Sequence, residues 1–329
     1  MTLKQRLALP NFFWRRRRRI CGVIATTDYE LVTQGVGLVE REGRAVLLLE
    51  GSEAAEFLQG QVTNDIEALT PGSGCYAALL NHKGKLRADM RVLRLAEDRL
   101  QVDAEPAAGP VLQHTFKTYS LGRDVRSRDL TGERLVLSLV GPEARGALED
   151  PPPAEEHACS EAPYGLQVTT DSGIDLVVEA SAAAGIVEEL GVPRVAVEAA
   201  ECVRIESGRP RLGLDMDDTT IPQEAGLNER AVSFTKGCYV GQETVARLFY
   251  KGKPNRHLRG LRLGEPAESG DPIEIDGKQV GKVGSTCVSP SLGPIALALI
   301  RREASPGDEV LVGVDKVPAR VVEPPFERA

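Results

Sequence analysis

The residues best suited to chemistry lie in the segment 236–243, which reads Lys-Gly-Cys-Tyr-Val-Gly-Gln-Glu. Its thiol, Cys238, precedes residues 242–248, whose pattern predicts the first two turns of a helix. A thiol beside a lysine and just before a helix N-terminus is favoured as thiolate, because the ammonium and the helix dipole both stabilise negative charge. The alternative is an inert cysteine packed in a tight turn, and no histidine lies nearby to act as a base. The segment by itself leaves both interpretations open.

Two carboxylates, Glu206 and Glu224, lie at a predicted helix end and in a proline-containing turn. A rigidly held carboxylate accepts two hydrogen bonds at once from a heterocycle, such as a pterin, that presents an N–H beside an amino group. Solvated acids at helix ends are the alternative interpretation. Arg204 and Arg247 are suited to binding the acidic tail of a ligand, and equally to surface ion pairs.

The composition excludes several classes of protein. The chain has 329 residues, 42% hydrophobic and 27% charged, which is typical of a soluble globular protein with two or three domains. Its net charge of −8 argues against a general nucleic-acid binder. No apolar run is long enough to span a bilayer.

The cysteines give no metal site. They are widely scattered, with no Cys-x-x-Cys pair and no Cys/His cluster, so the sequence encodes neither a zinc ribbon nor a local iron–sulfur site. Such spacing suits a reducing cytoplasm better than a disulfide scaffold, and we expect a cytoplasmic location. The six cysteines are Cys21, Cys75, Cys159, Cys202, Cys238 and Cys287.

The N-terminus carries an unbroken arginine run from Arg15 to Arg19, and no acidic residue precedes Asp28. A disordered tail, an organellar transit peptide and a start codon assigned too early are the three interpretations. We therefore leave residues 1–30 out of the fold argument.

The rest of the chain must position these groups. From residue 31 the pattern mixes strands and helices, with a break at the proline run 151–153. After residue 255, short apolar segments alternate with turn signals over about seventy residues, which predicts a small β-barrel or sandwich. The predicted strands are 44–50, 75–80, 86–95, 100–104, 125–129, 134–140 and 174–179, and the predicted helices are 54–63, 107–118, 181–190 and 198–206.

Residues 236–243 match the signature Lys-Gly-Cys-Tyr-x-Gly-Gln-Glu of the YgfZ family of folate-binding proteins, which are relatives of the glycine-cleavage T-protein (aminomethyltransferase). The resemblance extends over residues 31–326. Further matching segments are 58–65, 76–89, 221–224, 281–285 and 318–326, together with Arg247.

This resemblance implies an α+β, aminomethyltransferase-like fold of two interleaved α/β subdomains with a C-terminal β-barrel, and tetrahydrofolate or a one-carbon derivative bound at the centre. It implies a folate-binding body at 31–254 and a barrel at 255–329. Cys238, Asp89 and Lys236 are the candidate catalytic residues, and no metal ligand is expected. The candidate folate contacts are Glu206, Glu224, Arg204, Arg247, Tyr239 and Gln242.

Two departures from the T-protein separate the functional hypotheses. The T-protein has two adjacent acids in its hairpin, whereas this chain keeps only Asp89, and the T-protein lacks the cysteine motif. The leading hypothesis is a monomeric, tetrahydrofolate-binding accessory protein that serves iron–sulfur client or assembly proteins through Cys238. A true aminomethyltransferase and a folate-binding scaffold without chemistry are the alternatives.

Overall fold

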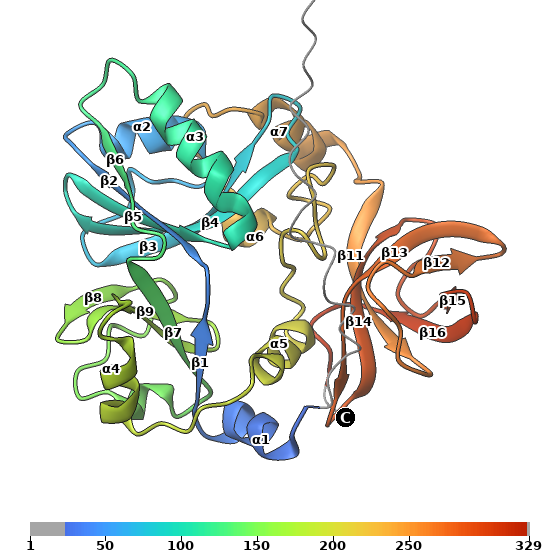
Figure 1. Ribbon diagram of the computed structural model, residues 1–329. Coiled ribbons are helices and arrows are strands. Elements are labelled where there is room, and N and C mark those ends of the chain that lie inside the picture. Colours follow the sequence, from blue (N-terminus) through green and yellow to red (C-terminus); the bar gives the residue numbers. More distant parts are fainter. Residues whose placement is uncertain (1–23, 328–329) are drawn as a thin grey trace, which may run out of the picture.

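The computed structural model describes residues 24–327, which build two five-stranded antiparallel sheets and a closed barrel (Figure 1). The arginine run at 15–19 lies outside the described residues. The prediction assigned the tail as far as residue 30, but residues 26–30 instead begin helix α1 (Thr26–Gln34), where Tyr29 is buried. The buried Tyr29 side chain therefore makes residues 26–30 part of the folded body, which charge patterning did not indicate. No helix in the described range is long and apolar enough to cross a membrane.

The first sheet has the strand order β1-β7-β10-β9-β8. Helix α4 (Ala183–Leu190) covers one face, where Ile186 and Val187 pack against buried residues of β7 and β10 such as Leu139 and Ile174. A short 3₁₀ helix, η2 (Ala144–Ala147), packs on the same core. The strands are β1 (Gly37–Arg41), β7 (Arg134–Val140), β8 (Cys159–Ala162), β9 (Gly165–Thr170) and β10 (Gly173–Glu179).

The second sheet has the order β3-β4-β5-β2-β6. Its strands are β2 (Ala45–Glu50), β3 (Ser73–Leu80), β4 (Leu86–Ala96), β5 (Arg99–Ala104) and β6 (Arg126–Asp129), and α2 (Ala54–Gln61), η1 (Pro106–Ala108) and α3 (Gly109–Tyr119) pack on it. The chain places β1 in the first sheet, crosses over to build β2–β6, and returns to complete the first sheet. This path confirms the predicted interleaving of two subdomains.

The barrel follows in the order β11-β14-β13-β12-β15-β16. Helix α5 (Val197–Glu206) lies between the first sheet and the barrel, and its buried face shares one core with α1 and with strands β11 and β14. The predicted fold class is confirmed. The barrel strands are β11 (Arg256–Leu263), β12 (Pro272–Ile275), β13 (Lys278–Ser289), β14 (Gly293–Arg301), β15 (Glu309–Val312) and β16 (Val317–Val322).

The β3–β4 hairpin carries the segment 232–251 on its tip. Tyr239 and Val245 pack against Ala78, Leu80 and Leu86 of the two hairpin strands. This segment follows the short helix α6 (Asn228–Ala231) and includes α7 (Gln242–Lys251). After α7 the chain continues into the first strand of the barrel. The cysteine motif is therefore held by the same hairpin that contributes to the centre of the molecule.

Candidate functional site

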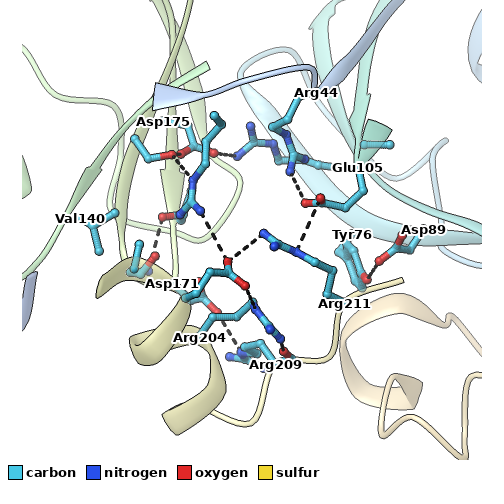
Figure 2. A pocket seen from close by; sticks show the side chains of 18 of the residues that line it. Arg44, Tyr76, Asp89, Glu105, Val140, Asp171, Asp175, Arg204, Arg209 and Arg211 are labelled. Atoms are coloured by element: carbon cyan, nitrogen blue, oxygen red, sulfur yellow. Dashed lines mark hydrogen bonds and ion pairs between the residues drawn. The ribbon is translucent and has the colours of Figure 1, made fainter. Parts of the chain in front are cut away.

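A central cavity of about 610 Å³ opens between the two sheets, α5 and the chain that follows α5 (Figure 2). Its volume lies within the usual range for small-molecule sites. The wall is dominated by charged side chains of both signs. The arginines are Arg41, Arg44, Arg91, Arg204, Arg209, Arg211 and Arg230, and the acids are Glu40, Glu42, Asp89, Glu105, Glu156, Asp171, Asp175 and Glu201.

A buried ion-pair chain joins the two sheets along this wall. The Arg91 Nε lies 2.8 Å from Oδ2 of Asp103, and its Nη1 lies 2.8 Å from Oδ2 of Asp175 on the other sheet. Arg44 reaches the second oxygen of Asp103 at 2.6 Å. Burial would raise the pKa of Asp103, but Arg91 and Arg44 together hold that pKa below its usual value. These linked ion pairs thereby fix the spacing of the two sheets at the cavity.

Tyr76 and Asp89, on adjacent strands β3 and β4, form a polar pair on the cavity wall (Figure 2). The Tyr76 hydroxyl donates a hydrogen bond to Oδ2 of Asp89. Oδ1 of Asp89 is buried and has no hydrogen-bond partner within residues 24–327. Burial raises the pKa of the Asp89 carboxyl. A ligand in the cavity could complete the hydrogen bonding of this carboxyl, which is the role of a binding or proton-transferring acid.

Arg204 also lines the cavity, but its guanidinium is already paired. Nε lies 3.1 Å from Glu201, Nη1 lies 3.1 Å from Asp215, and Nη2 donates to the Ser285 hydroxyl of the barrel at 2.6 Å. The residue thus ties α5 to the barrel. Arg209 and Arg211 follow α5 and are more exposed, and Arg211 pairs with Glu201 at 2.8 Å.

Glu206 does not line the cavity. Its buried carboxylate accepts hydrogen bonds from the Tyr29 hydroxyl at 2.8 Å and the Ser289 hydroxyl at 2.5 Å, and the Cys202 thiol lies 3.5 Å away. These partners come from α1, from α5 itself and from the barrel, so the carboxylate joins three elements in the interior.

Glu224 does not line the cavity either. Arg256 binds both of its oxygens, at 3.1 and 2.8 Å, and the Ile221 amide donates to it at 3.1 Å. The pair faces a separate depression of about 530 Å³ beside the barrel, which Lys85 and Arg302 also line. The turn that sequence analysis expected to hold this carboxylate rigid is present, but it presents Glu224 to the barrel strand β11.

Cys238 is exposed, and it lies outside the lining of the central cavity. The neighbouring Lys236 points away into the protein, where Nζ donates to the carbonyls of Gln59, Val62 and Asn64 at 2.6, 2.8 and 2.8 Å. Burial lowers the pKa of Lys236 to about 8. Its ammonium therefore anchors the motif to the end of α2.

The remaining candidates from the motif region lie on or next to α7. Tyr239 is buried, with its ring centroid 5.2 Å from the Lys236 Nζ. Gln242 is half-buried as the first residue of α7. Arg247 is exposed and pairs with Glu243 at 2.5 Å on the helix surface. None of the three lines the cavity.

The structure thus brings Asp89 and Arg204 together at the cavity, whereas Cys238, Lys236, Tyr239, Gln242, Arg247, Glu206 and Glu224 lie elsewhere. Sequence reasoning missed Arg91, Asp103 and Asp175. The available signal was the alternation of charged or polar with apolar residues along a predicted strand, as in residues 86–96 and 99–104. Within the described range no three His, Cys, Asp or Glu side chains gather as a metal site.

Comparison with known proteins supports the architecture. Residues 1–178 match the GCVT N-terminal domain model, and residues 256–327 match the glycine cleavage T-protein C-terminal barrel domain model. An aminomethyltransferase of Synechococcus sp. (strain RCC307) is 30% identical, with 97% of this chain and 94% of that protein covered. One of Thermotoga neapolitana is 28% identical, with 90% and 88% covered.

A solved structure gives the same result for the fold. Aminomethyltransferase T of the glycine cleavage system from Bartonella henselae superposes with a TM-score of 0.83 at 23% identity, covering 92% of this chain and 89% of that one.

Proposed function

The chain belongs to the family of the glycine-cleavage T-protein, and from that premise we propose that it binds tetrahydrofolate in the central cavity and serves iron–sulfur cluster assembly or repair through Cys238. The observation that carries the folate assignment is the buried Oδ1 of Asp89, which lacks a partner within the described residues, on the wall of a cavity of suitable volume. The exposed thiol in a YgfZ-type motif supports the second part of the proposal.

The side chains of the cavity wall offer suitable chemistry for both the pterin and the glutamate tail of a folate. A pterin presents hydrogen-bond donors that the Asp89 carboxyl accepts, and the glutamate tail carries carboxylates that arginines bind in bidentate fashion. We assign the tail to Arg209 and Arg211, which are more exposed than Arg204; the tail would compete with their ion pairs to Asp171 and Glu201, both at 2.8 Å. Bound tetrahydrofolate would supply a carrier for one-carbon units.

The proposed functional residues act at two places, the central cavity and the exposed cysteine motif. Asp89, with Tyr76 donating to its Oδ2, offers Oδ1 to the ligand as a hydrogen-bond acceptor. Lys236 anchors the motif, and Cys238 is exposed to a partner. Because one thiol cannot hold a cluster, the partner supplies the other ligands.

Calorimetric titration with tetrahydrofolate tests the cavity assignment. In Asp89→Asn the amide oxygen keeps the hydrogen bond from Tyr76, and an NH₂ group replaces the acceptor Oδ1. The ligand thereby loses one hydrogen bond, and its affinity should fall about tenfold or more. Glu224→Gln is the matched control outside the cavity and should bind as the wild type does. Equal affinity of the wild type and Asp89→Asn contradicts the assignment.

Complementation tests the role of the thiol. In cells that lack this protein and have low activity of an iron–sulfur enzyme, Cys238→Ala should fail to restore that activity. Cys75→Ala, which removes a half-buried thiol, should restore it. Full rescue by Cys238→Ala, with folate binding intact, removes the thiol from the function and leaves the scaffold and the aminomethyltransferase hypotheses.

One observation favours aminomethyl transfer instead: Asp89 lies at the cavity and Cys238 does not. That hypothesis predicts that an aminomethyl-bearing lipoyl carrier protein and tetrahydrofolate react to give methylene-tetrahydrofolate, ammonia and the free dihydrolipoyl carrier. The activity would be lost in Asp89→Asn and kept in Cys238→Ala. Absence of product with the wild type dismisses it.

A further inference from the structure

An exposed aromatic patch surrounds the second half of α7. The rings of Phe234 and Phe249 stack with centroids 3.8 Å apart, and Tyr250 meets Phe249 edge to face at 5.0 Å. Phe249 is 46% exposed, Tyr250 is 66% exposed, and Val240, which precedes α7, is 41% exposed. Large apolar side chains gathered at one place on a surface typically mark a site of interaction. We call Phe234, Val240, Phe249 and Tyr250 the aromatic patch.

Cys238 belongs to the same surface. The stacking of Phe234 on Phe249 brings the chain just before the thiol against the C-terminal half of α7, and Val240 follows the thiol by two residues. At the other end of the helix, a Cβ on Gly84 would lie 2.8 Å from Cβ of Thr244, so the β3–β4 turn touches the first turn of α7. The helix has ten residues and is about 15 Å long, so the turn at its start and the aromatic rings near its end are about one helix length apart.

The rim of this surface is basic. Lys83, Lys251 and Lys253 are exposed, and the structure shows no ion pair for them within residues 24–327. Glu243 is the only acid between residues 232 and 255, and Arg247 pairs with it. A positive rim on a chain of net charge −8 is a local arrangement that attracts an acidic partner.

We propose that the aromatic patch and its lysine rim dock an acidic segment of a partner protein and present that partner's sulfur or cluster ligand to Cys238. This inference rests on the proposed function, since it identifies the partner of the same thiol. The exposed aromatics supply the apolar anchor, and the lysines select for charge and speed the encounter. A nucleic acid fits less well, because the faces of Phe234 and Phe249 are turned toward each other and cannot both stack on bases.

Thiol–disulfide exchange with two synthetic peptides measures this preference. Each peptide carries one cysteine as a mixed disulfide with nitrothiobenzoate, flanked by leucines and by either glutamates or lysines. The Cys238 thiolate attacks the peptide sulfur, a disulfide forms between Cys238 and the peptide, and coloured nitrothiobenzoate leaves as the thiolate. The full chain is used with Cys21→Ser, and Cys238→Ala gives the background.

We expect the acidic peptide to react about tenfold faster than the basic one at low salt, and the ratio to fall toward one in 1 M salt. Lys251→Glu/Lys253→Glu should abolish the preference, whereas Lys278→Glu/Lys282→Glu on the barrel strand β13 should keep it. Tyr250→Ser should slow the acidic peptide about threefold, while Val314→Ser, at an 88% exposed barrel position, should not. Neutral dithiodipyridine should react equally with all of these variants.

Equal rates for the two peptides, or an unchanged preference in Lys251→Glu/Lys253→Glu, overturn the docking surface. Strong competition by a short single-stranded RNA overturns it in favour of a nucleic-acid partner. Complementation separates this test from the proposed function. If the acidic peptide reacts faster but Cys238→Ala still restores enzyme activity in cells, the proposed function is wrong and the docking surface stands. If Cys238 is required in cells but the two peptides react equally fast, the docking surface is wrong and the proposed function stands.

Discussion

Gly84 and Gly241 touch through their backbones: a Cβ on Gly241 would lie 3.1 Å from the Gly84 α-carbon and 2.5 Å from the Asn81 carbonyl oxygen. Both have positive φ, 75° and 85°. Gly84 belongs to the β3–β4 turn, and Gly241 belongs to the cysteine motif. The exposed thiol is therefore seated on the hairpin whose strands carry Tyr76 and Asp89 to the cavity.

Gly241→Ala should lower the free energy of unfolding by about 2–4 kcal/mol, because it combines a strained positive φ with a collision against the Asn81 carbonyl. Urea denaturation measures this change. Gly226→Ala is the control: its φ is 69°, but nothing lies within 4 Å of an added Cβ, so it should cost about 1 kcal/mol. Equal losses of unfolding free energy in Gly241→Ala and Gly226→Ala would contradict close packing of the motif against the β3–β4 turn.

Lys236→Met should destabilise the protein by about 2–4 kcal/mol, since it leaves the buried carbonyl of Val62 and the partly buried carbonyls of Gln59 and Asn64 without their donor. Thermal and urea unfolding measure the loss. Lys251→Met, at an exposed position on α7, should change the stability by less than about 0.5 kcal/mol. A Lys236→Met protein of full stability shows that the ammonium does not anchor the motif.

Asp103→Asn should lower the unfolding free energy by about 3 kcal/mol or more, because it leaves Arg44 and Arg91 beside a neutral group in the buried wall. Lys316→Met, which breaks an exposed pair with Glu274, should cost at most about 1 kcal/mol. Chemical denaturation of the two variants gives the comparison. A small effect at Asp103 means that the ion-pair chain does not set the spacing of the sheets.

Because the pKa of His157 is lowered in the folded protein, His157 should reduce the free energy of unfolding in acid. Burial first, and then the nearby Arg91, lower the pKa of His157 from 6.5 to about 4. As the pH falls from about 6.5 to about 4, the unfolded chain takes up a proton that the folded chain does not, so stability is lost. The depression corresponds to at most about 3 kcal/mol.

His157→Asn tests this linkage, since asparagine tolerates the positive φ of 70° at this position. Urea unfolding at pH 7 and pH 4.5 should show a smaller loss for His157→Asn than for the wild type. His114→Asn, at an exposed histidine on α3, should lose as much as the wild type. An equal acid loss in the wild type and in His157→Asn assigns the effect to other groups.

Local sequence patterns predicted much of the backbone. The run 44–50 appears as β2, the pattern at 198–206 as α5, and the turn residues at 81–85 join β3 to β4. These predictions succeeded because apolar periodicity and turn chemistry act over a few residues. Strands β8 and β9 were not predicted, since they lie after a proline run in a polar segment.

The sequence by itself determined the motif around Cys238, the hairpin that carries Asp89 and the family to which the chain belongs. Only the tertiary structure decided which charged groups share the cavity. Glu206 bonds to Tyr29, 177 residues away, and Arg91 pairs with Asp175, 84 residues away. The partner of a buried charge is set by how distant strands and helices pack, because burial makes pairing obligatory and local sequence does not specify the partner.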